Sequence, residues 1–176
     1  MNAQMTQHKY SGPALTRWKV GHRLFFVQID LIILAIRQYV QEPTEHRLRR
    51  ISDLLRGSAA MMQFCADFGD PSYASVRDSM ANVDSNFTGV WSADHRVMIQ
   101  ELKKLRTSST GWSPSHCDLE DAIRVAYAAH AFICRRFVGD DSSLANKKVP
   151  GHKTLLEKFM PRTLAAIGAA PNSQAA

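Results

Sequence analysis

Apolar residues recur at steps of three and four along most of the chain, which is the spacing of one face of an α-helix. The pattern first appears over residues 16–40, Pro43 ends it, and it resumes after Thr44, a good N-cap residue. These two segments are predicted to form an antiparallel helical hairpin. Further helices are predicted over residues 71–81, 92–104, 118–138 and 152–167, with a kink at Pro161 in the last.

No stretch alternates apolar and polar residues as a half-buried strand does, so the predicted fold class is all-α. A length of 176 residues, 45% of them hydrophobic, is ordinary for one domain with a single core. We therefore predict one helical bundle over residues 14–168. The polar or small-residue ends, 1–13 and 169–176, carry no apolar pattern and are predicted to be flexible tails.

Composition and charge narrow the class of protein. The longest apolar run, residues 24–36, is interrupted by Gln28 and Asp30 and is shorter than the roughly 20 residues that span a bilayer. With no secretory signal pattern and too few cysteines for a disulfide framework, we expect a cytoplasmic protein without a membrane partner. The net charge of +6 is spread along the chain without an aromatic ladder, so no nucleic-acid partner is expected.

The helix predicted over residues 118–138 carries the most informative side chains. Tyr127, His130 and Cys134 follow one another at steps of three and four and therefore share a face. Alanines surround them and leave room for a flat, bulky group such as haem. An imidazole can bind haem iron axially, and a thiol one turn away, about 6 Å along the axis, could reach the edge of the porphyrin.

Spacing alone leaves alternatives open for this pair. A hydrogen-bonded core histidine above a buried cysteine is a common arrangement, and the usual haem attachment motif, C-x-x-C-H, is absent. Zinc is a second alternative, although His116, Cys117, His130 and Cys134 do not have the spacing of a zinc finger.

A second candidate group lies on the first helix. His22 begins a face continued by Phe25 and Phe26, and a neutral imidazole there could move a proton near pH 7 above a haem pocket floored by the two rings. The alternative is a half-buried histidine near the helix start.

Several segments together resemble the tryptophan 2,3-dioxygenase superfamily. HAFICRRFVG at 130–139, DDSSL at 140–144 and LLEKFMP at 155–161 are similar to the family's C-terminal core, and HRLFFVQ at 22–28 is similar to its distal histidine helix. SNFTG at 85–89 resembles the family's Ser-Gly-Phe-Gln segment, but the interval to the following arginine, Arg96, is longer here.

The chain also departs from that family. It is shorter, Arg23 and Leu24 replace an acidic pair, and the glycine-rich substrate loop is reduced. Cys134 stands where the dioxygenases have an apolar residue, and the resulting His-x-x-x-Cys is similar to bacterial haem-dependent tyrosine hydroxylases, which bind haem through a histidine and tether it through one cysteine.

The resemblance implies a haem-dependent oxygenase or hydroxylase that acts on a tyrosine- or indole-like substrate with peroxide or dioxygen, in bacterial secondary metabolism. His130 would be the iron ligand, His22 the distal acid and base, and Cys134 a covalent haem tether formed during turnover with oxidant. It also implies a homodimer. The side chains expected to contact haem or substrate are Phe25, Phe26, Phe87, Trp91, Arg96 and Arg135.

Two other classes stay open from the sequence. One is a haem protein without catalytic activity, a sensor or an electron carrier. The other is a basic helical interaction module that binds an acidic partner through Lys103, Lys104 and Arg106.

Overall fold

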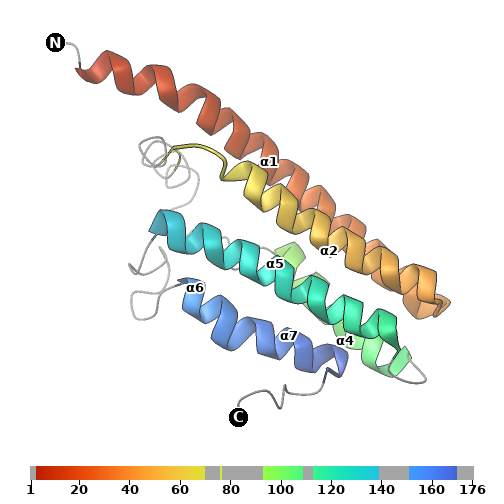
Figure 1. Cartoon of the computed structure of the whole chain (residues 1–176). Helices are drawn as coiled ribbons and strands as arrows, with labels where there is room; N and C mark the ends of the chain where they lie inside the picture. Colours follow the sequence, from red (N-terminus) through yellow and green to blue (C-terminus); the bar gives the residue numbers. More distant parts are fainter. Residues whose placement is uncertain (1–2, 70–75, 77–92, 109–112, 139–150, 170–176) are drawn as a thin grey trace.

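The computed structural model describes residues 3–69, 76, 93–108, 113–138 and 151–169. Within these ranges the chain is helical and contains no strand, which confirms the predicted all-α class. The elements are α1 (Ala3–Gln41), α2 (Glu45–Cys65), α4 (Ala93–Ser108), α5 (Pro114–Val138), α6 (Gly151–Lys153), the π-helix η2 (Thr154–Phe159) and α7 (Met160–Ile167). Figure 1 shows α5 on one side against α2 and on the other against the α6 to α7 segment.

The predicted hairpin of the first two helices is present, with α1 and α2 packed side by side (Figure 1). Thr44 caps α2, because its side-chain oxygen accepts a hydrogen bond from the Arg47 amide at 3.3 Å. At the other end of the hairpin the helices touch closely. A Cβ atom added to Gly21 would lie 2.0 Å from Sγ of Cys65, so only glycine fits there.

Helix α1 is longer than the sequence pattern predicts. It begins at Ala3 and contains Pro13, whereas the pattern predicted a start at residue 16 after a flexible tail. A helix that is already nucleated extends at little cost even through polar residues, so the absence of apolar periodicity does not mark its end. The predicted helix at 71–81 lies outside the described residues, except for Val76, which is helical and fully buried.

Helix α5 also starts earlier than predicted, at Pro114 instead of residue 118. The amide of Ser113 donates a hydrogen bond to Nδ1 of His116 at 3.1 Å, so the histidine reaches back to the helix start as Glu or Gln does in a capping box. Because histidine is not a usual residue of that motif, the sequence pattern did not reveal it.

The kink predicted at Pro161 takes the form of a widened turn. Residues Thr154–Phe159 are π-helical, and the Met160 amide bonds to the Leu155 carbonyl, five residues earlier. Pro161 has no amide hydrogen to continue an α-helical ladder. The segment then resumes as α7 and ends at Gly168, whose positive φ of 92° gives the left-handed conformation that closes many helices.

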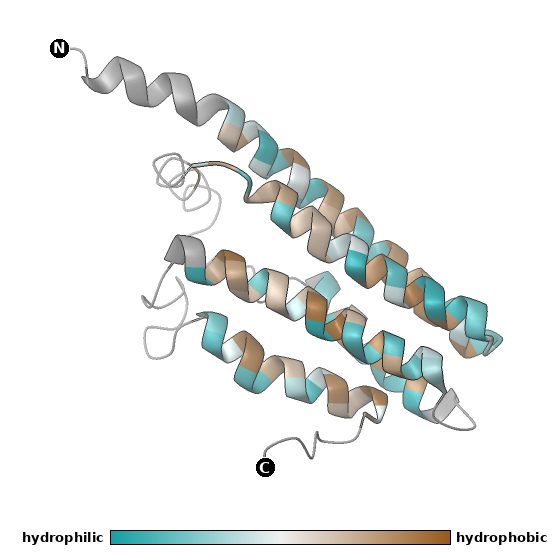
Figure 2. Cartoon of the chain, viewed as in Figure 1, coloured by the Kyte–Doolittle hydropathy of each residue, from teal (hydrophilic) through white to brown (hydrophobic). Residues whose placement is uncertain are grey.

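The core forms where α1, α2, α4, α5 and α7 meet, and Figure 2 shows the apolar stripes along these helices. Isoleucine and leucine side chains dominate it, including Ile29, Ile32, Ile36, Leu48, Ile51, Leu102, Leu105, Leu119 and Ile123. One buried carboxylate ties α4 to α1: Glu101 accepts from Arg37 at 3.1 Å and from Lys104 at 2.6 Å. The described helices include none with an apolar stretch sufficient to cross a membrane.

Candidate functional site

Two adjacent cavities lie between α1, α2, α4, α5 and the C-terminal segment. They share four lining side chains, His95, Tyr127, His130 and Thr163. The inner cavity is small, about 40 Å³, and mainly apolar; its other lining residues are Phe25, Ile29, Leu55, Ser58, Met62, Met98, Leu102, Ile123 and Ala126. The outer cavity is larger, about 310 Å³, and its other lining residues are Arg96, Ile99, Gln100, Lys103, Leu155, Phe159 and Arg162.

His130 stands where the two cavities meet. Helix α5 holds it on the face that also carries Ala126 and Tyr127, as the sequence predicted. Burial, together with the nearby rings of His95 and His22, lowers the pKa of His130 to about 4. The imidazole is therefore neutral at pH 7, the form in which its nitrogen lone pair can bind a metal ion or accept a proton.

His95 faces the same two cavities from α4, near the start of that helix. Burial lowers the pKa of this histidine as well. Arg96 was the only residue of α4 predicted to contact haem or substrate, although the spacing along this helix also carries a signal for His95. His95 precedes the buried residues Met98 and Leu102 at steps of three and four, which places the imidazole on the core face of α4.

Tyr127 and Thr163 fix the wall that both cavities share. The Thr163 hydroxyl donates to the Phe159 carbonyl at 3.0 Å, so its oxygen accepts the hydrogen bond from the Tyr127 hydroxyl at 2.7 Å. Both side chains are buried, and burial raises the pKa of Tyr127. The pair joins α5 to α7 beside His130.

His22 lies near this site but does not line either cavity. Its Nδ1 donates to the Trp18 carbonyl at 3.1 Å, and its ring lies 4.1 Å from the Trp18 ring. Burial lowers the pKa of His22, and the hydrogen bond to Trp18 opposes that effect. Since Nδ1 carries the proton, Nε2 is the acceptor atom of this ring.

Cys134 lies one turn after His130 on α5, partly buried against the main core. It is not among the residues that line the two cavities. Burial raises the pKa of its thiol to about 11, so the group is protonated at neutral pH.

The other predicted contact residues divide into three groups. Phe25 lines the inner cavity and Arg96 the outer one, and Phe26 packs edge-on to Phe25 with ring centres 6.1 Å apart. Arg135 is exposed on α5 and lines neither cavity. The remaining two, Phe87 and Trp91, lie outside the described residues.

The described residues contain no group of three or more His, Cys, Asp or Glu side chains arranged to hold a bare metal ion. The zinc alternative of the sequence analysis has no such cluster in this part of the chain. The site thus combines neutral imidazoles with an apolar inner cavity and with basic side chains that line the outer cavity.

Comparison with known proteins adds one finding. Residues 2–140 match the model of a family described as SfmD 3-methyl-L-tyrosine peroxygenase. Neither the curated proteins nor the solved structures gave a match. The matched range contains His22, His95, His130 and Cys134 and ends before the segment that supplies Leu155, Phe159 and Arg162 to the outer cavity.

Proposed function

The chain belongs to the SfmD 3-methyl-L-tyrosine peroxygenase family, and on this basis we propose that it is a haem-dependent oxidoreductase that oxygenates a small aromatic substrate with peroxide. The observation that carries the proposal is His130. Its imidazole faces both cavities and is neutral at pH 7, because its pKa is about 4. A neutral imidazole of this kind could hold haem iron.

The residues around His130 fit haem in their chemistry. The inner cavity, at about 40 Å³, supplies apolar side chains beside His130, and the outer cavity, at about 310 Å³, falls in the range of ligand pockets, about 300–1,000 Å³. Arg96, Lys103 and Arg162 line the outer cavity and can pair with carboxylates. Their partners would be the two haem propionates or the carboxylate of an amino-acid substrate.

Bound haem would supply the iron chemistry that activates peroxide. The protein's own contribution is the movement of a proton by a second imidazole. His95 lines both cavities, and its lowered pKa keeps it neutral and able to accept a proton from hydrogen peroxide and return it to the leaving oxygen. His22, through Nε2, is the alternative that the sequence resemblance favours.

The substrate side of the proposal rests on fewer residues. Phe25 presents aromatic surface at the inner cavity, with Phe26 packed edge-on to it, and ring contacts of this kind suit a phenol or an indole. The sequence alone predicts substrate contacts for Phe87, Trp91 and Arg135. A function in secondary metabolism is likewise proposed from the family alone.

We also propose that Cys134 tethers the haem. The thiol is one turn from His130 and is protonated, with a pKa of about 11. Addition of its S–H bond across a vinyl group would form one C–S bond and one C–H bond without net oxidation. If, after treatment with oxidant, an acid-organic extraction still removed all the haem from the denatured protein, the tether would be contradicted.

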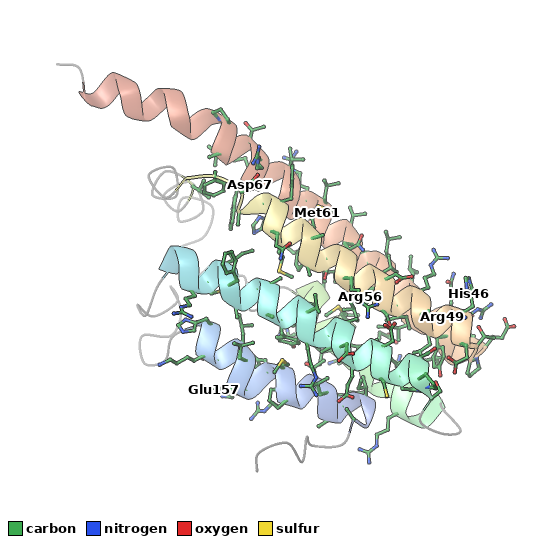
Figure 3. The ribbon with its side chains drawn as sticks, in the orientation of Figure 1. His46, Arg49, Arg56, Met61, Asp67 and Glu157 are labelled. Carbon is green, nitrogen blue, oxygen red and sulfur yellow. The ribbon has the colours of Figure 1, made fainter. Side chains whose placement is uncertain are left out.

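Absorption spectra test the haem site first. Protein expressed with added haem should give a Soret band that His130→Ala abolishes or shifts, and Cys134→Ala should move the pyridine haemochrome band. His46→Ala is the matched control, because His46 is exposed at the start of α2 (Figure 3) and lines neither cavity. A protein that stays colourless would contradict the proposal and favour the interaction module.

The proton-transfer role needs a separate experiment on haem-loaded variants. We expect His95→Ala to retain haem but to lower the peroxide-dependent oxygenation of a tyrosine-like substrate about 100-fold or more, the usual contribution of a general acid and base. His22→Ala is the comparison. A large loss in the His22 variant with none in the His95 variant would assign the role to His22 instead.

A further inference from the structure

Helix α1 carries a row of exposed apolar side chains on the face turned away from the core. Val20, Leu24, Val27, Leu31 and Leu34 are each between 40% and 55% exposed. We call this row the α1 stripe. Its members follow one another at steps of four, three, four and three, the a and d spacing of a coiled-coil seam.

This regularity distinguishes the α1 stripe from the other exposed apolar side chains. Phe64, Val97, Val125 and Phe132 are also exposed, but they are distributed over α2, α4 and α5. Single exposed apolar residues are normal on protein surfaces, whereas a regular row along one helix marks an interaction surface. The partner that such a seam fits is another helix with the same spacing.

The charges beside the α1 stripe indicate which helix that is. Arg23 and Asp30 are both exposed and lie on the same side of the row, seven residues apart. When a second α1 runs antiparallel with its Val27 opposite Leu24, Arg23 of each copy lies beside Asp30 of the other. The same register pairs Val20 with Leu31, so four members of the α1 stripe meet an apolar partner, while Leu34 lies opposite Arg17 at each end of the seam.

Other arrangements of two α1 helices lack this match. An antiparallel shift that sets Leu24 opposite Leu34 brings the two Asp30 side chains together, and like charges across a seam are unfavourable. In a parallel pair Asp30 faces Ala35 and forms no ion pair. Arg37, the next charged residue on this side, already binds Glu101 at 3.1 Å.

From this charge complementarity and the seam spacing we propose that the α1 stripe is a dimer interface, occupied by the antiparallel α1 of a second copy of this chain. The inference does not depend on haem or on the catalytic proposal. It assigns the expected homodimer to particular residues.

Sedimentation velocity over a concentration series tests the interface on the 176-residue chain. The wild type should reach dimer mass, and a Leu24→Glu, Val27→Glu double variant should remain a monomer with unchanged helical circular dichroism. Val125→Glu, on α5 and 46% exposed, is the matched control and should still dimerise. A monomeric wild type, or a dimer that survives the double substitution, would overturn the proposal.

The charge pair tests the register. Arg23→Glu and Asp30→Arg alone should each raise the dimer dissociation constant about tenfold, and their combination should restore it, because the pairs reform with the charges exchanged. Failure of the double variant to recover would contradict this register.

Cysteine cross-linking tests the direction, in a Cys117→Ser background that removes the exposed thiol. An oxidised mixture of Val20→Cys and Leu31→Cys proteins should give the mixed disulfide. If Val20→Cys instead cross-linked efficiently with itself, the helices would be parallel and the antiparallel assignment would be wrong.

Discussion

Three histidines with lowered pKa values gather in one part of this protein, and burial is the first cause of the lowering in each of them. His22, His95 and His130 come from three different helices and surround the cavity region, while His116 lies at the start of α5. A buried neutral imidazole offers a lone pair at pH 7 that an exposed one shares with water. The imidazoles around the cavities are therefore largely in the neutral form at pH 7.

His116 gives a test of what burial of a neutral histidine contributes to stability. Its folded pKa lies below the ordinary value of 6.5, so the unfolded chain binds the proton first. The contribution of the buried, neutral His116 to the free energy of unfolding is fully present above pH 6.5, and it is lost as the pH falls toward the folded pKa. His116→Gln keeps an acceptor for the Ser113 amide but cannot titrate.

We expect urea unfolding at pH 7.5 and pH 5 to show a smaller loss of stability on acidification in His116→Gln than in the wild type. His116→Ala, which removes the cap altogether, should cost about 1 kcal/mol at pH 7.5. Since the other histidines are present in all three proteins, equal pH dependence in wild type and His116→Gln would refute the role of His116.

The cysteines should differ sharply in reactivity. Burial raises the pKa of Cys65 and of Cys134 to about 11, so about one thiol in a thousand is ionised at pH 8. Cys117 is exposed. In haem-free protein, iodoacetamide should therefore modify Cys117 first, as followed by peptide mass spectrometry, and Cys117→Ser should lose the rapid phase. Rapid labelling of Cys134 would show that its thiol is not buried as described.

At the scale of elements, the sequence predicted which segments are helical but not where two of them begin. Apolar periodicity reports the face that packs, so it located the segments that reach the core. It could not report the start of α1, which extends through polar residues, or the start of α5, which depends on the Ser113 and His116 cap.

The contact between α1 and α2 gives the sharpest prediction at this scale. Gly21→Ala would place a methyl group 2.0 Å from Sγ of Cys65, and such overpacking costs about 1–3 kcal/mol. Adding Cys65→Ala makes room, so the double variant should be more stable than the sum of the two single changes predicts. Both effects can be read from chemical denaturation.

Gly57→Ala is the matched control in the partner helix. There the nearest atom is Nε2 of Gln28, 2.9 Å away at the end of a flexible side chain that can move. Its penalty should be the smaller of the two. If the two glycine substitutions lowered the free energy of unfolding equally, the close contact between Gly21 and Cys65 would not be the cause of the loss.

At the scale of the whole molecule, the candidate site is assembled from segments far apart in the sequence. Spacing within α5 predicted that His130 shares a face with Tyr127. His95 reaches the same cavities from α4, and the spacing within α5 carries no information about residues of another helix. The outer cavity also depends on η2 and α7, whose arrangement follows from the widened turn before Pro161.

Arg162 tests this dependence on the C-terminal segment. If it pairs with a haem carboxylate, Arg162→Ala should weaken haem binding about tenfold, the loss of one charge-assisted hydrogen bond of roughly 1.5 kcal/mol. Lys158→Ala, an exposed position that lines neither cavity, should leave the affinity unchanged. Haem titration of the two variants gives the comparison. Equal haem affinities would show that Arg162 does not bind a haem carboxylate.

The position of that segment also bears on how such proteins diverge. The family match ends at residue 140, whereas Leu155, Phe159 and Arg162 shape the outer cavity. A substitution in this wall would change the shape of the outer cavity without altering α4 or α5, the helices that hold His95 and His130. Under the proposed function, the family match therefore bears more on the oxidant chemistry than on the molecule oxidised, because the matched range contains His95 and His130 but not Leu155, Phe159 and Arg162.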